Sequence, residues 1–155
     1  MSANQNFLPT QLYVSLDAPN QEMFRKVNRS VYKDGWDRLN RSLEIIGKLN
    51  VRRVIRVTVI KGINDSEELL DSWAAIIKKA NPEFLEIKSY MHIGMSQKRL
   101  SRENMMIHTE VQEYANKMAQ ATGYVVKDES IGARIVLLVR PDIKDKSTKL
   151  VFEGS

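Results

Sequence analysis

The stretch Val54–Tyr90, VIRVTVIKGINDSEELLDSWAAIIKKANPEFLEIKSY, decides the fold. Its first part, Val54–Ile60, is rich in β-branched side chains and predicts a strand. Apolar residues then recur at three- and four-residue steps over Leu69–Ala80, which predicts a helix. Phe84–Tyr90 alternates apolar and polar residues and predicts a second strand. The stretch therefore indicates a strand–helix–strand unit with parallel strands.

Both ends of this predicted helix are marked in the sequence. We expect Asp65 to cap its start, with Glu68 reaching back three residues later. We expect Asn81-Pro82 to end it, because proline cannot continue the hydrogen-bond ladder.

The pattern continues on both sides of the unit. The further predicted elements are strands at Gln11–Leu16 and Ala133–Val139, helices at Trp36–Leu49 and Val111–Met118 (closed by Gly123), and a short strand Tyr124–Val126 joined to the last strand through a turn at Asp128–Ser130.

Strands that alternate with helices predict an α/β fold with mostly parallel strands and flanking helices. A parallel sheet needs both faces covered, either in an open doubly wound sheet or as one arc of a barrel. Periodicity leaves these two open. We expect one folded unit over residues 1–142 and a polar tail over 143–155.

Composition excludes several classes of protein. The 155 residues are 43% hydrophobic and 28% charged, as in ordinary soluble globular chains, and no apolar run is long enough to span a membrane. The first residues do not resemble a signal segment, so we expect a cytoplasmic protein. A net charge of +5 is compatible with a polyanionic partner.

Cysteine is absent and histidine occurs twice, at His92 and His108. The chain therefore offers no disulfide, no thiolate site and no cysteine nucleophile, and we expect no metal site made from its own side chains. Its sequence contains no P-loop and none of the GxGxxG, GxSxG or HExxH motifs.

Polar side chains gather where the predicted parallel strands end. Asp17 follows the first strand, and Lys61 and Asn64 follow the second. The carboxyl ends of parallel strands are where α/β folds build their sites. Each residue also has a simpler explanation: a turn aspartate, a solvated lysine or a capping asparagine.

Lys88 is the least ordinary single residue, because a lysine inside a parallel strand must face a polar cavity or a wet interface. The loop that follows its strand carries Lys98, Arg99 and Arg102, a set suited to phosphate groups, although a solvated surface loop would have the same composition.

Three runs together resemble a known family: Leu8–Pro19 (LPTQLYVSLDAP), Arg56–Asn64 (RVTVIKGIN) and Glu86–Ser96 (EIKSYMHIGMS). In this order and spacing they are similar to the C-terminal half of 4-demethylwyosine synthase, most closely the archaeal form. That enzyme is the radical S-adenosylmethionine lyase of tRNA wybutosine biosynthesis. The likeness extends over about residues 8–142, through Arg99-Leu100, Asn104-Met105, His108, Glu110-Val111, Asp128–Ser130 and Arg134–Arg140.

The resemblance implies a partial (β/α) barrel of the radical S-adenosylmethionine type. It implies chemistry in which N1-methylguanosine beside the anticodon and pyruvate give 4-demethylwyosine, with S-adenosylmethionine and a [4Fe–4S] cluster as cofactors. By this analogy the cofactor-binding residues are Ser15, Asp17, Thr58, Lys61, Asn64, Lys88, Tyr90 and Met91. The same analogy implies that Lys98, Arg99 and Arg102 contact tRNA phosphates. No catalytic residue is assigned.

The missing cysteines set this sequence apart from the family, whose CxxxCxxC cluster motif has no counterpart here. We therefore expect the chain to be inactive alone, and to work with a cysteine-bearing N-terminal half or to self-associate through open sheet edges. The alternatives are a non-catalytic tRNA-binding remnant and an α/β domain that binds a phosphorylated metabolite.

Overall fold

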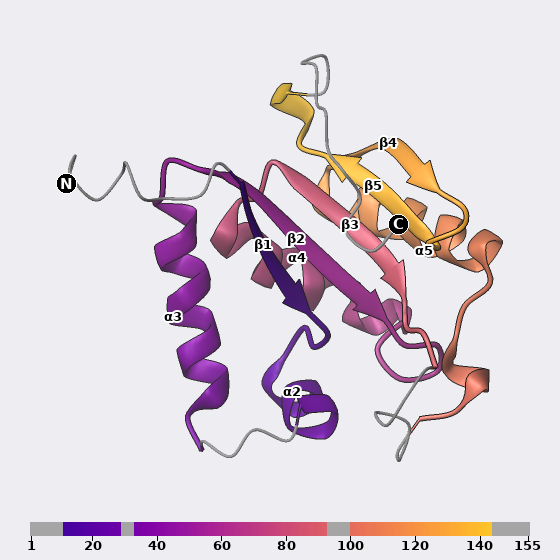
Figure 1. The fold of residues 1–155 in the computed structure, drawn as a ribbon. Helices are drawn as coiled ribbons and strands as arrows, with labels where there is room; N and C mark the ends of the chain where they lie inside the picture. Colours follow the sequence, from indigo (N-terminus) through magenta and orange to yellow (C-terminus); the bar gives the residue numbers. More distant parts are fainter. Residues whose placement is uncertain (1–10, 29–32, 93–99, 144–155) are drawn as a thin grey trace.

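The computed structural model describes residues 11–28, 33–92 and 100–143. It contains a five-stranded mixed sheet with the strand order β1-β2-β3-β5-β4 (Figure 1). The strands are β1 (Gln11–Leu16), β2 (Arg52–Val59), β3 (Phe84–Ser89), β4 (Val125–Ser130) and β5 (Ile135–Val139). The α-helices are α2 (Gln21–Asn28), α3 (Gly35–Gly47), α4 (Leu70–Ala80) and α5 (His108–Thr122). Short 3-10 turns are η1 (Glu67–Leu69), η3 (Arg102–Asn104) and η4 (Pro141–Ile143).

The strand–helix–strand unit predicted from Val54–Tyr90 is confirmed, since β2 and β3 pair in parallel and α4 connects them. β1 also pairs with β2 in parallel. Asn81 ends α4 in the left-handed conformation, with φ of 44°, directly before Pro82. The prediction for Asp65 is wrong: the helix starts as the 3-10 turn η1, and the Asp65 carboxylate instead accepts the Gly62 N–H at 2.9 Å.

The last two strands differ from the expectation of a mostly parallel sheet. Helix α5 crosses over to β4, which is the outer strand, and β5 then returns antiparallel between β4 and β3. Asp128–Ser130 belongs to β4 and not to a turn, and the chain reverses over residues 131–134. The reversal ends at Arg134 in the left-handed region, with φ of 54°.

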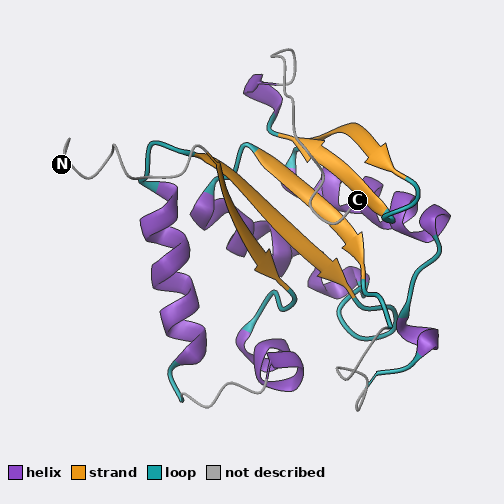
Figure 2. Cartoon of the chain, viewed as in Figure 1, coloured by secondary structure: helices purple, strands orange, loops and turns teal. Residues whose placement is uncertain are grey.

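All three long helices lie on one face of the sheet. Figure 2 shows α4 and α5 behind the strands, and α3 packs against α4 beside them. The main core forms between these helices and alternate strand residues, among them Ile55, Val57, Leu85 and Leu138. This excludes the doubly wound alternative, which has helices on both faces. The described strands form an open sheet with edges at β1 and β4, so a closed barrel is not observed.

The opposite face is called the helix-free face from here on, because none of the long helices covers it. The part of this face near the amino ends of the parallel strands is apolar. There Val54, Phe84, Leu137 and Val139 form a small buried cluster that Tyr13 and Ile143 flank.

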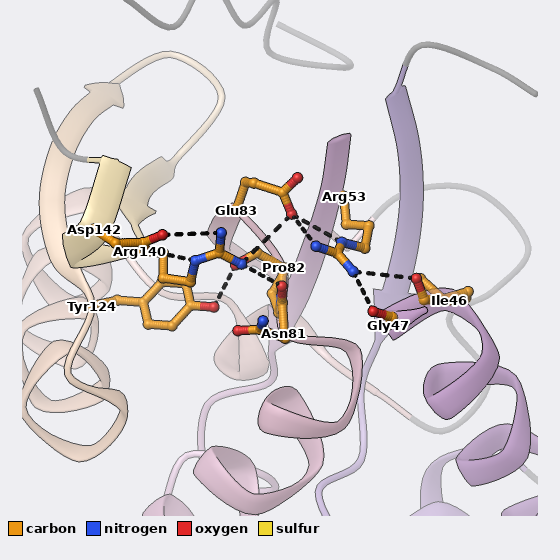
Figure 3. Close-up of polar contacts among 9 residues, drawn as sticks. All are labelled: Ile46, Gly47, Arg53, Asn81, Pro82, Glu83, Tyr124, Arg140 and Asp142. Atoms are coloured by element: carbon orange, nitrogen blue, oxygen red, sulfur yellow. Dashed lines mark hydrogen bonds and ion pairs between the residues drawn. The ribbon is translucent and has the colours of Figure 1, made fainter. Parts of the chain in front are cut away.

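A charged network fastens the amino ends of the parallel strands (Figure 3). Arg53 on β2 donates to the Glu83 carboxylate at 2.9 Å and to the Gly47 carbonyl at the end of α3 at 2.7 Å. Arg140 donates to the Asn81 carbonyl at 2.9 Å and lies 3.8 Å from Glu83. The two arginines therefore tie the C-terminal ends of α3 and α4 to the sheet, where helix carbonyls lack partners.

Candidate functional site

Polar side chains form two rows across the helix-free face, nearer the carboxyl ends of the parallel strands than its apolar cluster. The strand register pairs Ser15 with Arg56 and Arg56 with Glu86, which makes the first row. One step nearer the carboxyl ends, Thr58 pairs with Lys88, which makes the second row. Because side chains alternate along a strand, all five belong to this face. Lys88 thus lies between Thr58 on β2 and Ile135 on β5.

Arg56 and Glu86 form a buried ion pair within the first row. Arg56 donates from Nε to one Glu86 oxygen at 3.0 Å, and its Nη2 lies 2.9 Å from the same oxygen. Glu86 is fully buried, while the Arg56 side chain is 14% exposed and lies over the Tyr13 ring. The second Glu86 oxygen is buried without a hydrogen-bond partner. The charge of Glu86 thus depends on Arg56 for its compensation.

The rim at the ends of β1 and β2 is held by Asn64. The amide of this fully buried residue donates to the carbonyls of Asp17 and Thr58, both at 2.9 Å, and accepts the Ile60 N–H at 2.7 Å. Both amide hydrogens are thereby engaged with backbone. Asn64 was predicted as a cofactor-binding residue, but it offers no further donor to a ligand.

Ser15 and Asp17 lie at the end of β1, where the sequence predicts a ligand contact. Ser15 is exposed on the helix-free face and Asp17 is partly buried just after the last residue of the strand. Asp17 and Thr58 are brought together through Asn64. The end of β1 is therefore held beside Thr58, a residue of the second row.

Lys61 follows β2 as predicted, but its ammonium pairs with Glu110 on α5 at 2.6 Å. This hydrogen bond, followed by one from the Ile107 backbone, holds the pKa of the Glu110 carboxyl below its ordinary value. The Lys61 side chain is directed to the start of α5, so its charge is already compensated in part.

Tyr90 and Met91 follow β3. Tyr90 is buried, its backbone N–H donates to the Val59 carbonyl at 2.8 Å, and its hydroxyl lies 3.2 Å from Nδ1 of His92. Met91 is partly buried. The His92 N–H donates to the Met105 sulfur at 3.0 Å, which ties the end of β3 to the segment before α5.

The segment 101–107 docks on the rim, an arrangement that sequence reasoning missed. Asn104 and Lys61 exchange two hydrogen bonds at 2.9 Å, and the Met106 N–H donates to the Ser89 hydroxyl at 2.9 Å. Arg134 donates to the Met106 carbonyl at 2.9 Å. The one local signal was the pair Ser101 and Asn104, whose mutual capping bonds start η3.

The predicted phosphate-binding cations are described in part. Arg102 is exposed in η3, two residues before Asn104, which donates to the Lys61 carbonyl. Lys98 and Arg99 lie outside the described residues. A groove of about 650 Å³ between the C-terminal parts of α4 and α5 contains none of the predicted site residues, so it lies apart from the rim.

The donor set does not fit an iron–sulfur cluster. Such clusters are held by cysteine thiolates, and the 155 residues include no cysteine. Within residues 11–28, 33–92 and 100–143, no group of three or more histidine or carboxylate side chains is placed to hold a metal ion. No helix in these same ranges is both long and apolar enough to cross a bilayer.

Comparisons with known proteins show which family this chain resembles. The family described as "Wyosine base formation" matches residues 79–140. The chain is 40% identical over 142 residues to the S-adenosyl-L-methionine-dependent tRNA 4-demethylwyosine synthase of Pyrococcus abyssi, and 37% identical over 130 residues to that of Methanocaldococcus jannaschii. This chain belongs to the 4-demethylwyosine synthase family. It corresponds to the C-terminal portion of those synthases, as the sequence predicted.

Two solved synthase structures share the fold. TYW1 with a lysine-pyruvate adduct bound superposes with a TM-score of 0.75 at 32% identity, over 86% of this chain and 42% of that one. An archaeal TYW1 superposes with a TM-score of 0.67 at 26% identity, over 91% of this chain and 43% of that one. The Pyrococcus match covers 91% of this chain but 41% of the relative, and the Methanocaldococcus match covers 84% and 40%. The chain thus spans less than half of a 4-demethylwyosine synthase.

Proposed function

We propose that the chain supplies the C-terminal strands of a tRNA-modifying radical S-adenosylmethionine enzyme that makes 4-demethylwyosine from N1-methylguanosine and pyruvate. The observation that carries this proposal is the 40% identity over 142 residues to the Pyrococcus synthase. The polar rows and rim on the helix-free face supply the matching chemistry, at the strand ends where α/β folds bind ligands.

The rim residues suit S-adenosylmethionine in charge and position. The Asp17 carboxylate can accept ribose hydroxyls, and the Lys88 ammonium can pair with the carboxylate of the methionyl group. Thr58 and Ser15 add hydroxyl groups, and Tyr90 and Met91 add apolar surface. When bound, the cofactor supplies the radical chemistry, and this chain's side chains bind and orient it.

The cluster that reduces the cofactor belongs to a second polypeptide segment in this proposal, since the present residues cannot ligate it.

The two edges of the sheet, β1 and β4, differ in how readily a strand of that segment could pair with them. Within the described residues, β1 has β2 as its one strand partner, and its sequence QLYVSL has no charge and no proline. β4 has an irregularity in its pairing with β5 between Val126 and Asp128, and it also carries the three charged residues Lys127–Glu129.

Bulges and charges on an edge strand prevent further pairing, whereas a regular uncharged edge favours it. We therefore place the second segment at β1. Mixing this chain with the N-terminal portion of an archaeal relative tests the placement by sedimentation and by iron retained in the complex. Leu12→Lys on β1 should prevent assembly and Val126→Lys on β4 should not. Equal effects of both variants would contradict the placement.

The tRNA contact is proposed for Lys98, Arg99 and Arg102. Contacts to phosphates weaken as salt rises, because bound counterions are released. Arg102→Ala should weaken tRNA binding by the chain and flatten its salt dependence, while Arg41→Ala on α3, also an exposed arginine, should not. Unchanged binding after Arg102→Ala would contradict this part of the proposal.

A non-catalytic tRNA-binding role is the second candidate, and the absence of cysteine favours it. It keeps the same cationic residues but needs no second segment. Salt-dependent tRNA binding without assembly or product formation would select it over the first proposal.

A further inference from the structure

Asn64 occupies the gap where the ladder between β1 and β2 ends. The last paired residues are Leu16 and Val57, and the next residues along the two strands are Asp17 and Thr58. Asn64 donates one amide hydrogen to each of their carbonyls at 2.9 Å. A side chain from the following loop therefore continues the connection between the two strands by one residue.

Three further contacts fix the position of Asn64. Its side-chain oxygen accepts the Ile60 N–H at 2.7 Å, its backbone N–H donates to the Ile60 carbonyl at 3.1 Å, and its own carbonyl accepts Nε1–H of Trp73 at 3.2 Å. Trp73 is fully buried in the main core. The core thus locates Asn64, and Asn64 locates the end of β1.

We propose that Asn64 is a positioning residue, which sets the place of Asp17 at the rim and does not itself contact the ligand. The inference rests on the proposed function in one respect, namely that Asp17 faces the bound cofactor. It changes the role of Asn64 from ligand contact to support of a ligand contact.

The chemistry of an amide is needed at this place. Two carbonyl oxygens require two donors, and the Asn64 Nδ2 group supplies both, while its oxygen takes the donor at Ile60. Aspartate has almost the same shape but would set a carboxylate oxygen against two carbonyl oxygens. Asn64→Asp therefore keeps the volume of the side chain and removes the attraction that holds Asp17.

Asn104 provides a matched control on the other side of the same loop. It also donates to a backbone carbonyl, that of Lys61 at 2.9 Å, and also accepts a backbone N–H, that of Ser101 at 2.8 Å. Within the described residues, its hydrogen bonds join it to Ser101 and Lys61, and none of them reaches β1. Asn104→Asp thus repeats the chemical change without the proposed connection to Asp17.

The first experiment needs no ligand. Amide hydrogen exchange of the full chain is compared for the wild type, Asn64→Asp, the milder Asn64→Ser and Asn104→Asp. We expect protection over residues 15–18 to fall at least tenfold in the Asn64 variants and less than twofold in Asn104→Asp. Unchanged protection there would overturn the proposal. Global unfolding of both Asn64 variants would also overturn it, since Asn64 would then be a requirement of the whole fold.

The second experiment is a double-mutant cycle in S-adenosylmethionine affinity, measured by calorimetric titration. Asn64→Asp should weaken binding at least tenfold, and adding it to Asp17→Asn should weaken binding less than twofold further. Additive losses would overturn the proposal, because Asn64 would then act independently of Asp17. No binding by the wild type would contradict the cofactor role of the rim, while the exchange experiment would still decide the role of Asn64.

Discussion

Removing Arg56 should destabilise the chain more than removing Arg56 together with Glu86. Glu86 is fully buried, and it accepts a hydrogen bond from Arg56 Nε at 3.0 Å and forms an ion pair with Arg56 Nη2 at 2.9 Å. Arg56→Met therefore leaves a buried carboxylate without compensation, which costs about 3–5 kcal/mol. Arg56→Met with Glu86→Met removes that charge, and a buried pair replaced by apolar residues of similar size is often neutral, so we expect a net cost under about 1 kcal/mol.

The assay is urea unfolding at pH 7, followed by circular dichroism, for the two single variants and the double variant. The pair Arg53 and Glu83 supplies the comparison, since it has the same 30-residue separation but is embedded in a larger network. Arg53 also donates to the Gly47 carbonyl, and Glu83 also faces Arg140. The double Met variant there should lose at least about 2 kcal/mol, because these other groups lose their partners. A double Arg56/Glu86 variant as unstable as Arg56→Met alone would refute the reasoning.

Further predictions concern packing and titration. Gly47→Ala should destabilise the chain by about 1–3 kcal/mol, because an added Cβ would lie 2.6 Å from the Lys79 carbonyl oxygen. Gly132→Ala is the control, since its added Cβ meets nothing within 4 Å. Equal unfolding midpoints of the two variants would contradict this prediction. Burial raises the pKa of Tyr114 and Tyr124 above the ordinary 10.0, so the stability that these residues contribute is present below pH 10 and is lost as pH rises further. Their tyrosinate absorbance should therefore appear together with unfolding. Tyrosinate absorbance from these two residues in the folded chain near pH 10 would contradict this prediction. Lys61→Met should reduce the acid-induced loss of unfolding free energy by under about 1 kcal/mol. The reason is that the lowered pKa of Glu110 gives stability that is lost as pH falls. An unaltered pH profile of the unfolding free energy would count against a contribution from this ion pair.

The sequence was sufficient for local elements with strong periodicity. The strand–helix–strand unit over Val54–Tyr90 and the stop at Asn81-Pro82 follow from side-chain pattern and proline geometry alone. The direction of β5 cannot be predicted from the side-chain pattern, because an apolar run such as IVLLV is buried equally well in either direction. Helix α2 was also missed, since its eight residues QEMFRKVN present few apolar positions.

The candidate site shows the same division. Strand alternation places Ser15, Thr58 and Lys88 on one face, and the registers agree. The supporting role of Asn64 and the docking of Asn104 and Met106 depend on contacts across 17 to 47 residues. Such contacts leave no local pattern, so an asparagine that binds a ligand and one that braces a strand end have the same appearance in the sequence.

Formation of 4-demethylwyosine is the most direct test of the central proposal. The chain is combined with the cysteine-bearing N-terminal portion of an archaeal relative, S-adenosylmethionine, pyruvate, a reductant and tRNA that carries N1-methylguanosine, and the nucleosides are analysed by mass spectrometry. We expect product in the complete mixture, none when either polypeptide is omitted, and strongly reduced product with Lys88→Met. An assembled, iron-loaded mixture that forms no product, or product formed equally well without this chain, would contradict the account.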